Sequence, residues 1–183
     1  LDIEQALGRE LLLRLVADAD VLIESYPPGH LESLGLGYQV LRETNPGLVV
    51  SSITYFGQTG PYRDYRGGDL VVQALGGFLH AVTGSADLPP MGTALEQMEI
   101  TVARNGAIAI MAALLHRQKS GEGQHIDLST MEAAVSTPSG LIHPYSFTGR
   151  SPKRGGSDGN VMDGMHLSTK DGEVTLTTAG TGG

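Results

Sequence analysis

The chain has 183 residues, 40% of them hydrophobic, which is enough for one ordinary domain or for part of a larger one. With 12 basic and 20 acidic side chains, the net charge of −8 argues against nucleic acid as a partner, although a local basic patch can still bind one anionic ligand. The absence of cysteine excludes a disulfide framework and a cysteine nucleophile, and it favours a reducing, cytoplasmic compartment.

The first half of the chain alternates helical and strand-like segments. Leucines at helical spacing predict a helix over 4–17, and the apolar run 20–24 predicts a buried parallel strand. A second helix is expected over 31–44 and a second buried strand over 48–53. This alternation predicts an α/β fold with a parallel sheet.

The second half begins after a glycine-rich loop over 56–68, and a helix is expected from residue 69 to 78. The stretch 95–116 predicts a long helix that is apolar nearly all round and therefore buried between layers. A strand over 124–129, a short helix over 130–137, a second glycine-rich tract over 147–164 and a strand-like segment over 174–177 complete the chain.

The two ends resemble cuts in a longer polypeptide. Leu1 is not a methionine and starts no signal sequence, and the last residues directly follow a strand-like segment. We therefore expect an internal piece of a longer protein. No apolar run reaches the roughly 18 to 20 residues of a membrane span, so we expect no membrane insertion.

Generic motifs give little support to other chemistries. The run 155–159 satisfies the G-x-S-x-G pattern of a hydrolase, but no strand precedes it and no helix follows it. The six histidines never fall at the i, i+4 spacing of a helical metal pair, so we expect no metal site.

Two carboxylates, Glu96 and Glu99, lie at the start of the long apolar helix. A glutamate in such a stretch needs a partner or the positive end of a helix. The residues alone leave two interpretations open: a helix-start carboxylate that stabilises by capping, or a functional group of a site.

Several motifs follow one another in fixed order along the chain. They are Ala19–Gly29 (ADVLIESYPPG), Leu34–Tyr38 (LGLGY), Asn45–Val49 (NPGLV), Gly57–Tyr62 (GQTGPY) with Asp69, Ala112–Gln124, and Asp127–Ser129. In this order they resemble the family III CoA-transferases, the group of formyl-CoA transferase and carnitine CoA-transferase. The resemblance extends from residue 1 to about residue 178.

The resemblance implies a Rossmann-like large domain with a parallel sheet and a smaller domain, in an interlaced homodimer. Residues 1–140 would be part of the CoA-binding large domain, whose first βα units would precede Leu1. Residues 141–183 would be the linker, a glycine-rich loop and the start of the small domain. The implied partners are acyl-CoA and a small carboxylic acid as substrates, with no permanently bound cofactor.

The resemblance implies that Glu99 is the catalytic nucleophile, at the place where family members carry an aspartate. Its carboxylate would attack the acyl-CoA thioester, and the resulting anhydride would become an enzyme-linked CoA thioester that the acceptor acid resolves. An alternative is a non-catalytic, CoA-thioester-binding half of a tandem or assembled protein. The related racemases carry a histidine where this chain has Gly68, which argues against racemization.

The resemblance also places the CoA-binding residues. Ser25, Tyr26, Pro28 and Gly29 correspond to the turn that faces CoA, in which the family's usual arginine is replaced by Pro27. Gly155, Gly156 and Gly159 correspond in position to a mobile glycine loop over the active site, which would supply backbone N–H donors to an oxyanion.

Overall fold

The computed structural model describes residues 1–82, 89–93, 95–137, 145–149 and 165–176. The helices are α1 (Ala6–Ala17), α2 (His30–Ser33), α3 (Tyr38–Thr44), α4 (Asp69–Leu75), α5 (Phe78–Val82), α6 (Gln97–Ser120) and α7 (Thr130–Ser136). The strands are β1 (Val21–Glu24), β2 (Val49–Thr54), β3 (His125–Ser129), β4 (Met165–Ser168) and β5 (Glu173–Leu176). The three predicted parallel strands and the helices expected over 4–17, 95–116 and 130–137 are present, with ends that differ by a few residues. Helix α5 and strand β4 were not predicted, and β1 is not buried as expected, since Ile23 is 59% exposed.

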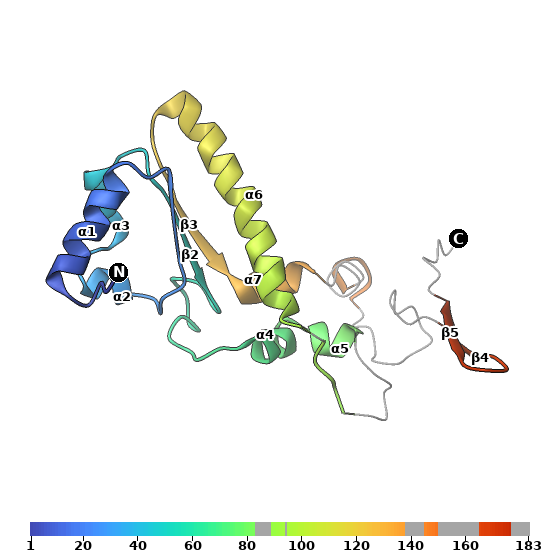
Figure 1. Cartoon of the computed structure of the whole chain (residues 1–183). Coiled ribbons are helices and arrows are strands. Elements are labelled where there is room, and N and C mark those ends of the chain that lie inside the picture. Colours follow the sequence, from blue (N-terminus) through green and yellow to red (C-terminus); the bar gives the residue numbers. More distant parts are fainter. Residues whose placement is uncertain (83–88, 94, 138–144, 150–164, 177–183) are drawn as a thin grey trace.

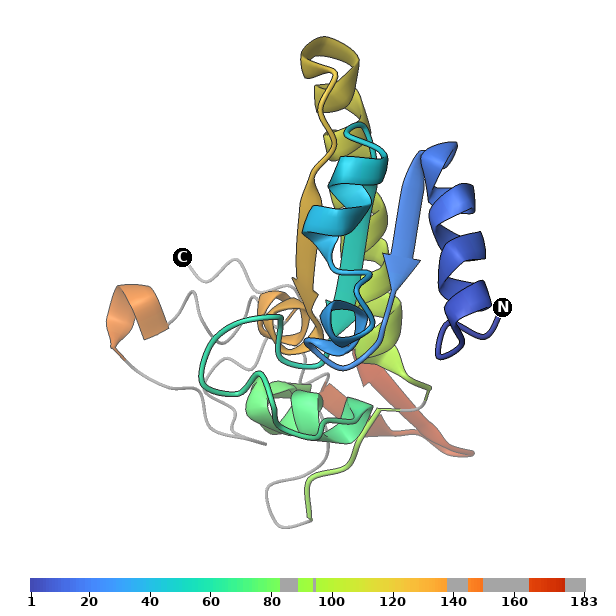
Figure 2. The same cartoon turned by 90° about the vertical axis from the view of Figure 1, so that its left-hand side faces the viewer.

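The three strands β1, β2 and β3 form a parallel sheet in that order. Val21 pairs with Val49, and Val50 pairs with His125. Because all three strands run in one direction, their carboxyl ends meet at one edge of the sheet, close to α4 and to the start of α6 (Figure 2). This arrangement confirms the predicted α/β class with a parallel sheet.

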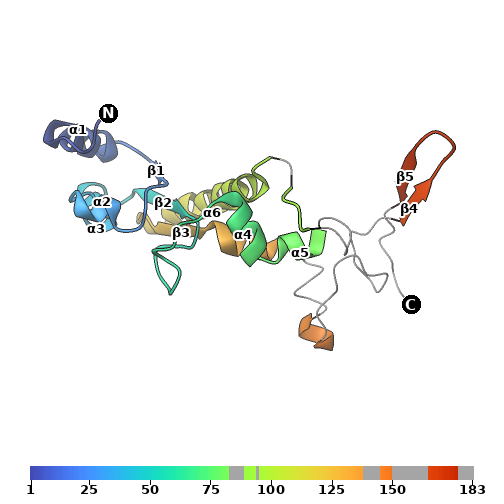
Figure 3. The same cartoon turned by 90° about the horizontal axis from the view of Figure 1, so that it is seen from below.

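Helices cover both faces of this sheet. The helices α1, α2 and α3 lie on one side and α6 lies on the other (Figures 1 and 3). On the α1 side, Val16, Leu41, Leu48 and Val50 form a buried apolar cluster. A second cluster lies under the first turns of α6, and its members are Phe56, Val72, Phe78, Met98 and Ala134.

The segment expected as one helix over 31–44 is two short helices. Gly35 has a φ of 72°, in the left-handed region that glycine enters at little cost, and the chain turns there between α2 and α3. Gly77, with a φ of 78°, separates α4 from α5 in the same way.

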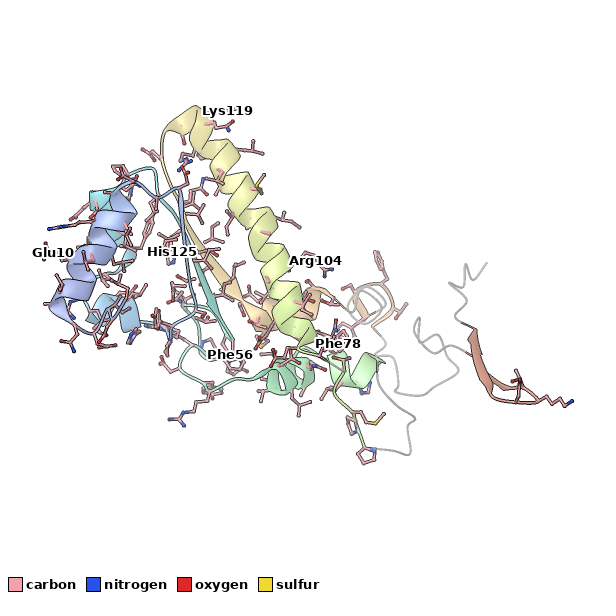
Figure 4. The ribbon with its side chains drawn as sticks, in the orientation of Figure 1. Glu10, Phe56, Phe78, Arg104, Lys119 and His125 are labelled. Atoms are coloured by element: carbon pink, nitrogen blue, oxygen red, sulfur yellow. The ribbon has the colours of Figure 1, made fainter. Side chains whose placement is uncertain are left out.

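Helix α6 is not buried on all sides, contrary to the prediction from its composition. One side packs on β2, β3 and α7, whereas Ile100, Ile108, Met111 and Leu115 are between 53% and 65% exposed. Among the described residues nothing covers this second side, on which the labelled Arg104 also projects (Figure 4). By length and composition α6 is long and apolar enough to cross a bilayer, a test that the core helix of an ordinary globular domain also passes.

The C-terminal part of the described chain is a hairpin. β4 and β5 pair antiparallel, with Met165 opposite Leu176 and Ser168 opposite Glu173. The strand expected near 174–177 is therefore present. The division into a domain over 1–140 and a second region over 141–183 stays a prediction.

Candidate active site

A cavity of about 800 Å³ opens at the carboxyl edge of the sheet. Ligands of open α/β sheets bind at this edge because the loops that leave the strands converge there. Its walls come from the turn after β1, the end of β2, the loop before α4, the first turns of α6 and the start of α7. The lining residues are Ser25–Pro28, Ile53–Phe56, Arg63–Gly67, Glu99, Val102, Ala103 and Thr130.

The cavity brings together two groups of predicted site residues that are far apart in the sequence. Ser25, Tyr26 and Pro28 line it on one side, and Glu99 lines it from α6. The ring of Tyr26 stacks on His30 at a centroid distance of 4.8 Å and is 43% exposed, so a large face of this aromatic ring remains open to a ligand.

Gly29 does not line this cavity but directly follows Pro28, which does. Its φ is 85°, and a Cβ atom at this position would be 3.1 Å from Nη2 of Arg63. Arg63 therefore brings a cation to the turn in which Pro27 stands where an arginine was expected. The three predicted loop glycines, Gly155, Gly156 and Gly159, lie outside the described residues.

Glu99 occupies the first turn of α6, where the positive end of the helix dipole favours a carboxylate. The Tyr55 hydroxyl donates a hydrogen bond to Oε1 of Glu99 at 3.2 Å. Among the residues that the structure describes, no hydrogen-bond donor contacts Oε2. One oxygen of the carboxylate is thus held by Tyr55, and the residue lines the cavity.

The start of α6 is fixed from α4. Oδ1 of Asp69 accepts a hydrogen bond from the backbone N–H of Met98 at 2.9 Å. The Nε2 atom of the buried Gln73 donates a hydrogen bond to Oδ2 of Asp69. Oε1 of Gln73 accepts a hydrogen bond from the backbone N–H of Thr93 at 3.2 Å. The bond to Met98 satisfies one of the first-turn N–H groups of α6 that have no partner within the helix, and it fixes the backbone next to Glu99.

Tyr55 was not identified from the sequence. It directly follows β2, and its backbone carbonyl accepts from the N–H of Met131 at 3.0 Å. Burial, and then the charge of Glu99 and the hydrogen bond to it, raise the pKa of the Tyr55 phenol above 10.0. The phenol therefore keeps its proton at neutral pH and acts as a donor. Its one sequence signal is a polar aromatic residue at the carboxyl end of a strand.

The polar groups that line the cavity include the Glu99 carboxylate, tyrosine hydroxyls and arginine guanidinium groups. Among the described residues, no group of three or more histidine or acidic side chains is arranged to hold a metal ion. A carboxylate that lines one cavity together with an exposed aromatic ring and a guanidinium suits attack on an acyl group carried by a large anionic ligand.

Comparison with known proteins identifies the class. The profile of CoA-transferase family III matches residues 1–182. The chain therefore belongs to CoA-transferase family III, which confirms the resemblance seen in its motifs.

Individual relatives agree with this assignment. The succinate–glutarate CoA-transferase of Agrobacterium fabrum is 39% identical over 176 residues, which are 96% of this chain and 44% of that enzyme. The succinyl-CoA–D-citramalate CoA-transferase of Chloroflexus aurantiacus is 36% identical over 157 residues, 86% of this chain and 39% of that enzyme. The chain thus spans less than half the length of these curated relatives.

The fold agrees with a solved structure as well. The crystal structure of a CAIB/BAIF family protein from Brucella suis has a TM-score of 0.84 and 38% identity to this chain. The match covers 94% of this chain and 46% of that chain.

Proposed function

We propose that the protein transfers coenzyme A from an acyl-CoA to an acceptor carboxylic acid. The observation that carries this proposal is the shared cavity, in which the turn with Tyr26 and the carboxylate of Glu99 face one volume. In such a cavity the nucleotide or pantetheine part of CoA would lie along Tyr26 while the thioester reaches Glu99.

Each described site residue has a role in this scheme. Glu99 is the nucleophile, and its carboxylate attacks the thioester carbonyl without a separate base, because a carboxylate is ionised at neutral pH. Ser25, Tyr26, Pro28 and Gly29 form the CoA-facing turn. Arg63 and Arg66 supply cations for the phosphate groups. Gly155, Gly156 and Gly159 remain candidates for the loop that closes over the site.

We propose succinyl-CoA as the donor. The relatives of Agrobacterium fabrum and Chloroflexus aurantiacus are named for succinate or succinyl-CoA, and so are further relatives at 33–36% identity. The protein would need no permanently bound cofactor, since the carboxylate itself carries the group being transferred.

The test is capture of an enzyme-linked intermediate in the full-length protein. Incubation with succinyl-CoA should give a covalent CoA adduct by mass spectrometry, and hydroxylamine should then inactivate the protein. Glu99→Gln should abolish both effects. Glu96→Gln is the matched control, because this neighbouring carboxylate does not line the cavity and its variant should form the adduct normally.

The result also decides between catalysis and binding alone. A protein that binds succinyl-CoA but gives no adduct would be the alternative, a non-catalytic CoA-thioester-binding half of a larger assembly. An adduct that persists in Glu99→Gln would contradict the assignment of the nucleophile.

We further propose a cytoplasmic homodimer with interlaced subunits. Cytoplasmic location is supported by the cysteine-free composition. Two Chloroflexus aurantiacus relatives are named as alpha and beta subunits of one transferase, so assembly with a different subunit is the competing arrangement. Light scattering of the full-length protein expressed alone should give twice the subunit mass; a monomer would contradict the homodimer.

A further inference from the structure

Tyr55 donates a hydrogen bond to Glu99, and the function proposed above assigns no role to this bond. Its hydroxyl oxygen is 3.2 Å from Oε1 of Glu99, and both residues line the cavity of about 800 Å³. The two residues are 44 positions apart in the sequence and belong to different elements, the end of β2 and the first turn of α6.

The phenol is held in place from several sides. The backbone carbonyl of Tyr55 accepts a hydrogen bond from the N–H of Met131. The Tyr55 ring packs against the apolar cluster that contains Phe56 and Met98. The backbone of Gly67 lies against the ring so closely that a side chain there would overlap with it. A donor fixed in this way loses little entropy and needs little reorganisation when charge develops next to it.

We propose that Tyr55 is a second catalytic residue, which stabilises the oxyanion that forms on the carbonyl oxygen of Glu99 when the enzyme-linked intermediates are attacked. This inference rests on the proposed function, since it requires Glu99 to carry the acyl group and then CoA.

The bond changes show why Oε1 is the relevant atom. Oε2 of Glu99 attacks the acyl-CoA carbonyl, the C–S bond breaks, and CoA leaves as a thiolate. The thiolate then attacks Cδ of Glu99, and the Cδ–Oε2 bond breaks as the donor acid leaves with Oε2. Oε1 remains on the enzyme as the carbonyl oxygen of the CoA thioester.

The acceptor completes the cycle without any change in oxidation state. An acceptor carboxylate oxygen attacks Cδ, the C–S bond breaks, and the thiolate attacks the acceptor carbonyl to form the new acyl-CoA. The C–O bond on the acceptor side breaks, and Glu99 is regenerated as a carboxylate. Both attacks on Cδ place negative charge on Oε1, the oxygen that Tyr55 already contacts.

The state of the phenol fits this role. Burial and the neighbouring Glu99 raise its pKa, so it remains a proton donor throughout the neutral range. Removal of one oxyanion donor typically lowers turnover by about 100- to 1,000-fold in other enzymes. Because this site is partly open to solvent, we expect an effect of about 10- to 100-fold here.

The experiment isolates the attack on Cδ. The CoA adduct of the full-length protein is formed with succinyl-CoA and freed of excess donor. Succinate is then added as the acceptor acid. It is the acid released when the adduct forms from succinyl-CoA, so the reverse of that step consumes it. The decay of the adduct mass is followed in the wild type, in Tyr55→Phe and in Tyr62→Phe, a control on the same loop region that does not line the cavity.

The expected result is a decay about 10- to 100-fold slower in Tyr55→Phe, with CoA affinity and the unfolding midpoint close to those of the wild type. Tyr62→Phe should decay at the wild-type rate. Decay of Tyr55→Phe at the wild-type rate would overturn the role of Tyr55 and leave the proposed function intact. A Tyr55→Phe protein with weakened CoA binding and a lowered unfolding midpoint would overturn it too, by showing a structural role.

Failure of the proposed function has a different signature. If the wild type forms no adduct with succinyl-CoA, or if Glu99→Gln still forms it, the covalent scheme fails and the inference about Tyr55 fails with it.

Discussion

Gly67 lies against the ring of Tyr55 so closely that a Cβ atom on Gly67 would be 2.6 Å from Cδ2 of the ring and still closer to Cγ. Real side chains do not approach one another to this distance. The glycine therefore allows the phenol to occupy the position from which it reaches Glu99.

Gly67→Ala should displace the Tyr55 ring and lower turnover by about 10-fold or more, since misplacement of a catalytic group by about 1 Å has an effect of this order. Gly68→Ala is the matched control, because a Cβ atom there meets no atom within 4 Å and its φ of −177° suits any residue. Steady-state rates of the two variants with succinyl-CoA are the measurement. Equal rates would show that the ring position does not depend on Gly67.

Asp69 holds two N–H donors at once, from Met98 and from Gln73. In Asp69→Asn the side-chain amide group can accept from only one of them, and the other contact becomes donor against donor. We expect a loss of about 1.5–3 kcal/mol in the free energy of unfolding, the usual range for a lost hydrogen bond to a charged group.

Urea unfolding of Asp69→Asn and of Glu43→Gln provides the comparison. Glu43 is exposed on α3, so its variant makes the same charge change without loss of a described contact and should unfold like the wild type. If the two variants have the same stability, the contact from Asp69 does not stabilise the start of α6.

The sequence predicted the parallel sheet well because β1 and β2 are short apolar runs, and in β3 the apolar Ile126 and Leu128 alternate with polar residues. Sequence patterns did not predict features that depend on residues distant in the sequence. The exposure of Ile108 and Met111 on α6 depends on what packs beside the helix, which composition does not report. The contact of Tyr55 with Glu99 joins two elements that become neighbours only when the sheet is assembled, so no spacing rule reveals it.

Arg63 brings a cation to the turn at Gly29, and we expect it to bind a phosphate group of CoA. Arg63→Ala should raise the KM for succinyl-CoA by about 10-fold, a typical loss for one charge-assisted hydrogen bond. The KM for a succinyl thioester of N-acetylcysteamine, which has no phosphate, should not change. Arg14→Ala, on the exposed face of α1, is the control and should alter neither value. An equal effect on both thioesters would argue against phosphate binding.

Tyr26 lines the cavity and is 43% exposed, so its ring can contact a ligand. Tyr26→Ala should weaken CoA binding by about 5- to 10-fold, because stacking of a base or an amide on an aromatic ring contributes about 1 kcal/mol or more. Tyr26→Phe should retain the affinity, since the ring rather than the hydroxyl makes the contact. Calorimetric titration with CoA measures both variants. Unchanged affinity in Tyr26→Ala would place CoA elsewhere.

Glu99→Asp tests the length of the nucleophile's arm. The carboxylate of Glu99 reaches the Tyr55 hydroxyl at 3.2 Å, and the shorter side chain would withdraw it by about one methylene length, beyond hydrogen-bond distance. In an enzyme adapted to glutamate, kcat should therefore fall by about 10- to 100-fold while the KM for succinyl-CoA changes little. A gain of activity in Glu99→Asp would instead indicate a site built for aspartate, in which the glutamate is the inactive form. Equal activity of the two proteins would mean that Glu99 is only a carboxylate at the start of a helix, and that the nucleophile is another group.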